Sequence, residues 1–298
     1  MRHFTAFGLG LAWMTLAGVA KESGEALRME GARVETYKTV AGTKLEVHIF
    51  EPAGAVATNR PAIVFFFGGG WNTGTPKQFE PQCRQLASRG MVAMTADYRV
   101  KSRHGVKPVQ CLADARSAIR WVRSNAARLG VDPARIAAAG GSAGGHLAGS
   151  TAFIDGFDEP GEDRSVSAAP NALVLFNPAL TLAPLPGWKA EGFGTSVGVE
   201  RLGCEPEAIS PAHHMRPGAP PAIIFHGRAD TTVPFRSAEV FAETMKAAGN
   251  RCELYGYGGQ PHGFFNQEPW QTKTLKEAEG FLESLGWIAG KPAEDAKK

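Results

Sequence analysis

The chain has 298 residues, of which 43% are hydrophobic and 20% charged, with 32 basic residues against 29 acidic ones. This length allows one large α/β domain, and the composition is that of a globular protein with a substantial core. A net charge of only +3 gives no electrostatic reason to expect a nucleic-acid partner.

The first 20 residues have the pattern of a secretory signal peptide. Arg2 and His3 form a polar start, residues 4–17 are almost wholly apolar, and the small residues 18–20 provide a cleavage site. The apolar run is shorter than the roughly 20 residues that span a bilayer, so no stable membrane anchor is expected. A buried N-terminal helix is the alternative, although the run shows no helical face. We therefore predict that residues 1–20 are removed and that the protein is exported, either to the periplasm or out of the cell.

Short apolar segments alternate with helical patterns along the rest of the chain. The candidate strands are 33–40, 43–50, 62–67, 91–96, 135–139, 172–176, 222–225 and 251–255. The candidate helices are 109–129, 146–153, 235–248 and 272–285. The first two strands suggest an antiparallel hairpin, whereas the later apolar strands suit a sheet covered on both faces. This alternation predicts a mostly parallel sheet of eight strands within one domain, residues 21–290.

Two further segments and the cysteines complete this prediction. The proline- and glycine-rich stretch 179–219 is expected to form a small lid or pocket wall. Residues 291–298 suggest a disordered tail. If the protein is exported, its four cysteines could pair in three ways or remain free, and the sequence does not choose; they are Cys83, Cys111, Cys204 and Cys252. Their spacing predicts no metal site, and no cofactor is expected.

The most specific motif is Gly-Gly-Ser-Ala-Gly at residues 140–144. It lies between a predicted strand and a predicted helix, which is the context of a nucleophile elbow. The turn is tight, so side chains at Gly140 and Gly144 would collide with neighbouring backbone. Ser142 would then present its hydroxyl at the positive end of a helix, as a catalytic nucleophile does.

A serine nucleophile needs a base and an acid later in the chain. His262 follows the last predicted strand and is the candidate base, while Asp230 follows the penultimate strand and is the candidate acid. An Asx turn or helix cap is the alternative role for Asp230. The other histidines are less suitable bases, because His226 ends a strand and His213 and His214 lie in the loop-like stretch.

An oxyanion intermediate would also need backbone donors. Gly69 and Gly70 follow the third predicted strand and could present N–H groups, together with that of Ala143. The glycine-rich loop has no Gly-Lys-Ser/Thr continuation, so it is not a phosphate loop. Trp71 and Trp188 are candidates for substrate contacts, or alternatively for cover over the core.

Together these motifs resemble the α/β-hydrolase superfamily, in particular the hormone-sensitive-lipase-like and acetyl-xylan or feruloyl esterase branch. The resemblance runs from about residue 33 to 286 and is most specific at residues 140–148. It implies an α/β-hydrolase fold and the triad Ser142, Asp230 and His262. One departure is Phe67, which stands where that branch usually has a histidine that orders the oxyanion loop.

Some further residues are expected to support the fold rather than the chemistry. Residues 97–99 and Asp114 are expected to provide buried ion-pair scaffolding, and His146 is expected to pack inside the domain. The sequence thus predicts a serine carboxylesterase that removes acetyl or other small acyl groups, with a polysaccharide-linked ester as one candidate substrate. A peptidase or amidase of the same fold and a non-catalytic binding module remain alternatives.

Overall fold

A computed structural model describes residues 27–54, 58–190 and 197–289. The predicted signal peptide, residues 1–20, and the predicted tail, residues 291–298, lie outside these described residues. Within them, eight strands form one sheet in the order β1-β2-β4-β3-β5-β6-β7-β8. β2 runs antiparallel to both of its neighbours, β1 and β4, and every other neighbouring pair in the sheet is parallel.

The strands lie close to the positions expected from the sequence. They are β1 (Arg33–Val40), β2 (Thr43–Phe50), β3 (Arg60–Phe66), β4 (Val92–Ala96), β5 (Val131–Gly141), β6 (Ala172–Phe176), β7 (Ala222–Gly227) and β8 (Cys252–Tyr257). Ala41 and Gly42 both have positive φ angles, of 47° and 77°, which suits the tight turn of the β1–β2 hairpin. The predicted fold, a mostly parallel eight-stranded sheet with helices, is confirmed.

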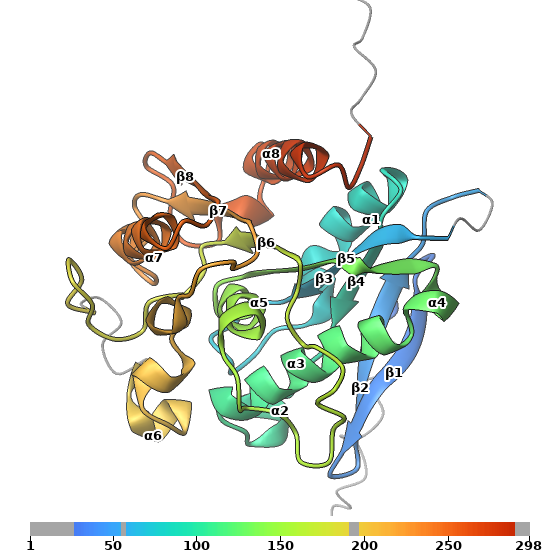
Figure 1. The fold of residues 1–298 in the computed structure, drawn as a ribbon, viewed down its shortest axis with the longest axis horizontal. Coiled ribbons are helices and arrows are strands. Elements are labelled where there is room, and N and C mark those ends of the chain that lie inside the picture. Colours follow the sequence, from blue (N-terminus) through green and yellow to red (C-terminus); the bar gives the residue numbers. More distant parts are fainter. Residues whose placement is uncertain (1–26, 55–57, 191–196, 290–298) are drawn as a thin grey trace, which may run out of the picture.

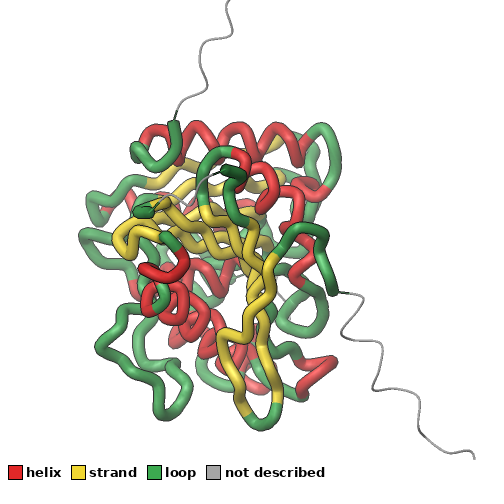
Figure 2. Tube along the Cα trace, turned by 90° about the vertical axis from the view of Figure 1, so that its right-hand side faces the viewer, coloured by secondary structure: helices red, strands yellow, loops and turns green. Residues whose placement is uncertain are grey.

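The helices cover both faces of the sheet (Figures 1 and 2). They are α1 (Glu80–Ser88), α2 (Lys101–His104), α3 (Pro108–Ser124), α4 (Ala126–Leu129), α5 (Ala143–Phe153), α6 (Val199–Leu202), α7 (Phe235–Ala247) and α8 (Trp270–Ser284). Residues of α3, α5 and α7 belong to one hydrophobic cluster, and residues of α1 and α8 to another on the opposite face. The single helix expected at 109–129 is two helices, α3 and α4, joined at Asn125.

The stretch expected to be a loop-like lid is more ordered than predicted. Besides α6 it holds two short 3-10 helices, η3 (Pro206–Ile209) and η4 (Pro211–His214). Leu180, Leu202 and Ile209 have no exposed surface and belong to the main hydrophobic cluster. Of the two roles predicted for this insertion, its described part fits that of a packed wall.

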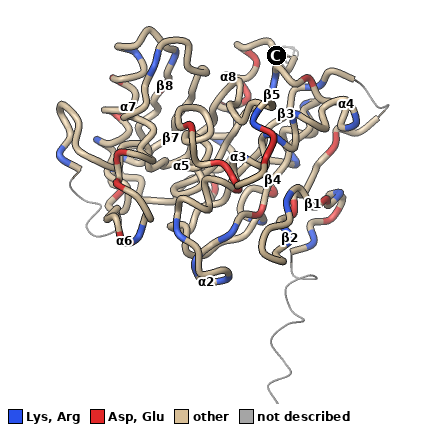
Figure 3. Tube along the Cα trace, turned by 60° about the horizontal axis from the view of Figure 1, so that its bottom comes forward, with Lys and Arg blue, Asp and Glu red and all other residues tan. Residues whose placement is uncertain are grey.

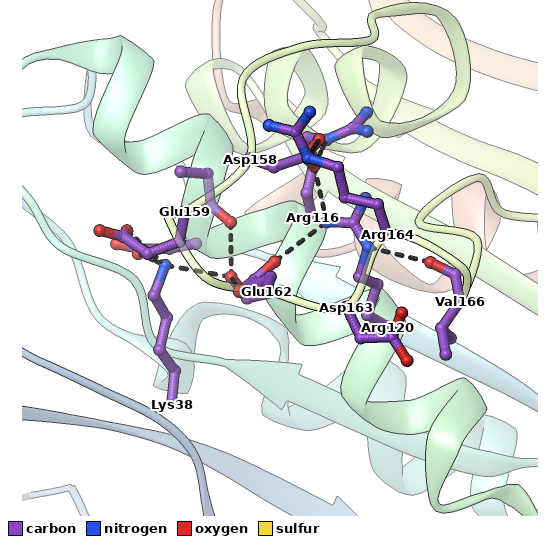
Figure 4. Close-up of polar contacts among 12 residues, drawn as sticks. Lys38, Arg116, Arg120, Asp158, Glu159, Glu162, Asp163, Arg164 and Val166 are labelled. Carbon is purple, nitrogen blue, oxygen red and sulfur yellow. Dashed lines mark hydrogen bonds and ion pairs between the residues drawn. The ribbon is translucent and has the colours of Figure 1, made fainter.

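Buried charges tie β1 and α3 to the loop that follows α5 (Figure 4). Arg99 forms two side-chain hydrogen bonds of 2.8 Å to Asp114, and Lys38 reaches the same carboxylate at 2.7 Å. Lys38 also contacts Glu159 at 2.7 Å. Ion-pair scaffolding was expected at 97–99 and at Asp114, and the structure shows that Arg99 and Asp114 form such a buried pair with each other.

The four cysteine thiols are free, and three of them are buried. Of the alternatives that the sequence left open, three pairings or free thiols, the structure therefore shows free thiols.

Candidate active site

Ser142 occupies a sharp turn between the end of β5 and the start of α5. Its φ of 54° and ψ of −119° are a conformation that residues with a side chain rarely adopt. A Cβ atom on Gly144 would overlap the carbonyl oxygens of Phe66 and Phe67, and one on Gly140 would lie 2.5 Å from the Phe66 oxygen. The steric reason given for these glycines is thus confirmed: β3 and the start of α5 approach too closely for side chains.

Three predicted residues, far apart in the sequence, form one chain of hydrogen bonds. Nε2 of His262 lies 2.9 Å from Oγ of Ser142, and Nδ1 of His262 lies 2.7 Å from Oδ2 of Asp230. An ionised carboxylate only accepts, so Nδ1 carries the proton and Nε2 is left to accept the serine hydroxyl proton. This is the geometry in which an imidazole can act as general base toward a serine.

The carboxylate of Asp230 is held by several further donors. Its Oδ1 accepts the backbone N–H groups of Thr232 and Val233, both at 2.9 Å. Its Oδ2 accepts Nδ2–H of Asn177 at 2.6 Å and lies 3.3 Å from Nε2 of His226. Burial alone would raise the pKa of Asp230, but the hydrogen bonds from His226 and His262 outweigh it and hold the pKa well below its usual range.

Asn177 and His226 were not expected to contact Asp230. Asn177 follows β6 directly, and His226 belongs to β7, the neighbouring strand. The carboxyl ends of parallel strands meet at one edge of a sheet, so a polar residue directly after an apolar strand was the available signal. His226 is fully buried and hydrogen-bonds the Val233 carbonyl at 2.8 Å, as its expected packed role requires.

The loop that carries His262 lies tightly on the end of β7. A Cβ atom on Gly227 would overlap the carbonyl of Gln260, two residues before the histidine. Glycine at this strand end therefore allows the loop to approach closely enough for His262 to reach both partners.

The glycine loop after β3 lies beside Ser142. A Cβ atom on Gly68 would be 3.3 Å from Cβ of Ser142. Gly69 and Gly70 have positive φ angles, of 121° and 60°, and their N–H groups have no acceptor in the part of the chain that the structure describes. Ala143 is the first residue of α5, where a helix N–H has no intrahelical acceptor. These groups are available to a negatively charged oxygen beside Ser142.

Phe67 does not leave this loop without support. Its ring stacks on Tyr98, with 4.1 Å between centroids, and its carbonyl accepts the Tyr98 hydroxyl at 2.7 Å. The N–H of Gly68 donates to Oε1 of Gln78 at 2.6 Å, and Gln78 in turn reaches Asn266 at 3.2 Å. Tyr98 and Gln78 thus hydrogen-bond the loop that a histidine usually orders in the hormone-sensitive-lipase-like branch.

A hollow of about 310 Å³ opens at these groups. Its lining includes Ser142, His262 and the three glycines 68–70, with Phe265 as an aromatic wall; the other lining residues are Gln78, Thr232, Gly263 and Asn266. The predicted serine, base and loop therefore border one cavity, which is large enough for a small organic group.

The two tryptophans expected at the substrate site are both largely buried. Trp188 is 7% exposed, donates its Nε1–H to the Thr181 carbonyl at 3.1 Å, and belongs to the core. Trp71 is 5% exposed and donates to Nδ1 of His146 at 3.3 Å. Neither lines the hollow at Ser142. Trp188 fits its alternative role as cover for the core, whereas Trp71 lines a larger neighbouring hollow that also includes Gly70, so its predicted contact with substrate stays a prediction. His146 is fully buried, as expected.

Residues 27–54, 58–190 and 197–289 contain neither a metal-binding cluster nor a membrane-spanning helix. No group of three or more His, Cys, Asp or Glu side chains there is arranged to hold a metal ion. No helix in those segments combines the length and hydropathy required to cross a bilayer.

Comparisons with known proteins point to one family. Residues 63–266 match the family described as alpha/beta hydrolase fold. Carboxylesterase NlhH of Mycobacterium tuberculosis is 29% identical over 248 residues, covering 75% of this chain and 72% of that protein. Thermogutta terrifontis esterase 2 phosphorylated by paraoxon matches at TM-score 0.82 and 52% identity, over 89% of this chain and 98% of that one. Its butyrate-bound structure matches at TM-score 0.82 and 52% identity, over 89% and 100%. This chain therefore belongs to the α/β-hydrolase family of carboxylesterases.

Proposed function

We propose that the chain hydrolyses carboxylic esters through a covalent acyl-enzyme, with Ser142 as nucleophile, His262 as base and Asp230 as acid. The observation that carries the proposal is the continuous hydrogen-bonded chain from Ser142 Oγ through His262 to Asp230. His262 takes the hydroxyl proton while Oγ attacks the ester carbonyl carbon. The imidazolium then protonates the leaving alcohol. In the second step His262 takes a proton from water, which attacks the acyl-enzyme carbonyl; Ser142 leaves with that proton and the carboxylic acid is released.

Two neighbours of the triad support this chemistry. The low pKa of Asp230 keeps its carboxylate ionised, so it can hold Nδ1–H of His262 and stabilise the imidazolium as it forms. The N–H groups of Gly69, Gly70 and Ala143 can donate hydrogen bonds to the carbonyl oxygen as negative charge develops on it. Removal of one such donor typically costs about a hundredfold or more in kcat.

The substrate we propose carries an acetyl or other small acyl group on a carbohydrate or similar alcohol. The hollow of about 310 Å³ at Ser142 suits a short acyl chain. The esterase 2 of Thermogutta terrifontis, which is about half identical to this chain, has been solved with butyrate bound. A second, larger hollow shares Gly70 with the first and offers room for a bulky alcohol.

The nucleophile is tested by labelling with paraoxon, which phosphorylates the Thermogutta esterase. We expect one diethylphosphoryl group per chain, located on Ser142 by peptide mass spectrometry, with loss of esterase activity in proportion. Ser142→Ala should neither be labelled nor hydrolyse p-nitrophenyl acetate. Labelling at another residue with Ser142 unmodified, or full activity in Ser142→Ala, would refute the proposal.

The substrate class is tested by comparing acyl chains and alcohols. We expect kcat/KM on p-nitrophenyl esters to be highest for acetyl to butyryl and to fall for longer chains, and acetate to be released from acetylated xylan. A preference for long acyl chains would overturn the small-acyl proposal. Faster cleavage of matched p-nitroanilides than of esters would favour an amidase instead.

A further inference from the structure

The second hollow lies directly beside the glycine loop and is basic. It has a volume of about 790 Å³, against about 310 Å³ for the hollow at Ser142, and Gly70 lines both. Its charged lining residues are three cations, Lys101, Lys107 and Arg201, and one carboxylate, Glu200. A ligand that enters from this side meets an excess of positive charge next to the proposed oxyanion donors.

Two of the cationic residues are hydrogen-bonded to the glycine loop or to Trp71 directly after it, Lys101 through its backbone and Arg201 through its side chain. The backbone N–H of Lys101 donates to the Trp71 carbonyl at 3.0 Å, so α2 begins where the loop ends. Arg201 of α6 donates Nη2–H to the Gly70 carbonyl at 2.8 Å, and its guanidinium lies 5.8 Å from the Trp71 ring centroid. The backbone of Lys101 is thus hydrogen-bonded to the residue that follows Gly70, and the side chain of Arg201 is hydrogen-bonded to Gly70 itself.

The third cation, Lys107, lies between α2 and α3. Lys107 precedes α3, and its side chain packs against the backbone at Gly203, just after α6, where an added Cβ would lie 3.1 Å from Cδ of Lys107. Figure 3 shows basic residues in both α2 and α6, the two short helices that border this region. Basic residues of α2, of α6 and of the segment between α2 and α3 thus line one hollow.

These cations are not neutralised by neighbouring acids. Within residues 27–54, 58–190 and 197–289, no ion pair joins Lys101, Lys107 or Arg201 to an acidic side chain. Asp97, close to α2, is instead engaged by Arg103 at 2.7 Å. Elsewhere in the same segments arginines commonly have acidic partners, as the Arg116 and Arg120 contacts with Asp158 illustrate. Unpaired cations that line a hollow are suited to an anionic ligand.

We propose that this hollow binds an anionic group of the ester substrate, a carboxylate, sulfate or phosphate located away from the scissile carbonyl. The inference rests on the proposed function in that the ester itself is held at Ser142. It adds that preferred substrates are acidic, and that Lys101 and Lys107 contribute to their recognition. The anion can belong to the alcohol, as in an acidic sugar, or to the acyl group, as in a dicarboxylic half-ester.

Matched substrates distinguish these two sources. In one pair, mono-p-nitrophenyl succinate is compared with p-nitrophenyl butyrate, which has an acyl chain of the same length without the charge. In the other, an acetylated methyl galacturonide is compared with the acetylated methyl galactoside. In at least one pair we expect kcat/KM to favour the anionic ester, and the preference to shrink as ionic strength rises. Equal kcat/KM within both pairs would overturn the proposal.

The lysines are tested by the double variant Lys101→Gln, Lys107→Gln, which retains Arg201 and its hydrogen bond to the glycine loop. The ratio of anionic to neutral kcat/KM should fall by about five- to tenfold, as expected for two removed charges near a partly solvated anion. Lys44→Gln with Lys276→Gln is the control, because it removes the same net charge at exposed lysines outside the hollow. An equal fall in the control would refute a local role.

A binding experiment separates this proposal from the proposed catalytic function. Mono-p-nitrophenyl succinate is titrated calorimetrically into Ser142→Ala, with and without the two glutamines. We expect the dissociation constant to rise by about fivefold or more when both lysines are replaced. An unchanged constant would contradict the anion site even if Ser142 proves to be the nucleophile. Charge-dependent binding to Ser142→Ala, together with no turnover of either ester by the unmodified protein, would retain the anion site and refute the esterase mechanism.

Discussion

Asn177 donates Nδ2–H to Oδ2 of Asp230 across 2.6 Å, and that oxygen also accepts Nδ1–H of His262. The amide thus shares one carboxylate oxygen with the imidazole. Asn177 has a φ of 43°, a conformation that asparagine and aspartate tolerate better than most residues. Its side chain is well placed to orient Asp230 without touching the hollow at Ser142, which makes it a positioning residue.

Replacing Asn177 by aspartate should impair catalysis while leaving the backbone turn intact. The substitution exchanges a donor for a second carboxylate beside Asp230, so the acid loses a charge-assisted hydrogen bond and gains a repulsion. Loss of such a bond costs about 1–3 kcal/mol, so we expect kcat/KM on p-nitrophenyl acetate to fall by roughly tenfold to a hundredfold. The pH dependence of kcat should change as well, which a purely structural defect would not cause.

Asn59→Asp is the matched control for this variant. Asn59 also has a positive φ, of 58°, but it lies on the surface before β3, at the opposite end of the strand from the glycine loop. Its kinetics should equal those of the unmodified protein. If Asn177→Asp had an unchanged pH profile and kcat, the proposed positioning role would be wrong.

Gly144→Ala should prevent the elbow from forming. The added methyl group would overlap the carbonyl oxygens of Phe66 and Phe67, so either β3 or α5 would have to move. Overpacking of this kind typically costs about 1–3 kcal/mol, and here it also displaces Ser142. We expect a lower unfolding midpoint in urea and at least a hundredfold loss of kcat/KM, since a displacement of about 1 Å can cost that much.

Gly280→Ala is the control for Gly144→Ala, and we expect it to have the opposite effect on stability. Gly280 lies within α8, and a Cβ atom there would meet nothing within 4 Å. Alanine should therefore stabilise the protein by about 0.5–1 kcal/mol through its helix propensity, with unchanged kinetics. Equal effects of the two substitutions would rule out the steric explanation for Gly144.

Asp114→Asn should destabilise the fold strongly. Asp114 has no exposed surface and neutralises both Arg99 and Lys38, so an amide there would leave two buried cations to Glu159 alone. Loss of one partner from a buried pair costs about 3–5 kcal/mol, measured as the free energy of unfolding in urea. Glu243→Gln is the control, because Glu243 pairs with Arg236 on the surface and should contribute less than about 1 kcal/mol.

The catalytic arrangement was more predictable than its surroundings. Ser142, Asp230 and His262 each follow or end an apolar strand, and the carboxyl ends of parallel strands meet at one edge, so the order of motifs predicts their meeting. Asn177 shares that placement but belongs to no motif. Trp188, a large apolar residue in a predicted loop, could equally contact substrate or cover the core, because its partner Thr181 becomes apparent only in three dimensions.

Secondary structure shows the same division. Strands were predictable because buried strands read as continuous apolar runs, as in Ala172–Phe176. Helix α1 was not predicted: it has nine residues, and only Cys83, Leu86 and Ala87 provide buried apolar side chains. The stretch 179–219 was read as a loop, because helices of four residues such as α6, which lies in its described part, leave no periodic pattern.

Export remains a prediction of the sequence and can be tested directly. Expressed with its own N-terminus in a Gram-negative host, the chain should appear in the periplasm or medium with Lys21 as its first residue, as judged by intact mass. Leu11→Arg should abolish processing, because a charge interrupts the apolar run, whereas Leu11→Ile should not. Unprocessed full-length protein in the cytoplasm would contradict the prediction.

His146 connects the nucleophile helix α5 to Trp71, which follows the glycine loop, and to Ile209 of η3. Its Nε2–H donates to the Ile209 carbonyl at 2.6 Å, which leaves Nδ1 to accept Nε1–H of Trp71 at 3.3 Å. Protonation of His146 would add a hydrogen to Nδ1, so its N–H would face the Nε1–H of Trp71 with no acceptor between them. Burial lowers the pKa of His146 to about 4, although the hydrogen bond to Ile209 acts in the opposite direction.

This low pKa makes stability depend on pH. In the unfolded chain a histidine has a pKa of about 6.5. Between that pH and about 4 the unfolded state therefore binds a proton at His146 that the folded state does not bind. The contribution of His146 is complete above about pH 6.5 and is lost as the pH falls toward about 4. The gap between the two pKa values corresponds to about 3 kcal/mol.

Two substitutions at His146 separate the proton from the packing. Glutamine cannot titrate and can still donate to Ile209, so His146→Gln should flatten the slope of the unfolding free energy between pH 6.5 and 4 by about one proton. His146→Ala should flatten the slope equally, and should also lose about 2–3 kcal/mol at pH 7.5, because it leaves a cavity and an unpaired carbonyl. Urea unfolding across this pH range measures both effects. An unchanged slope in both variants would mean that another group causes any acid sensitivity, because neither variant can take up the proton.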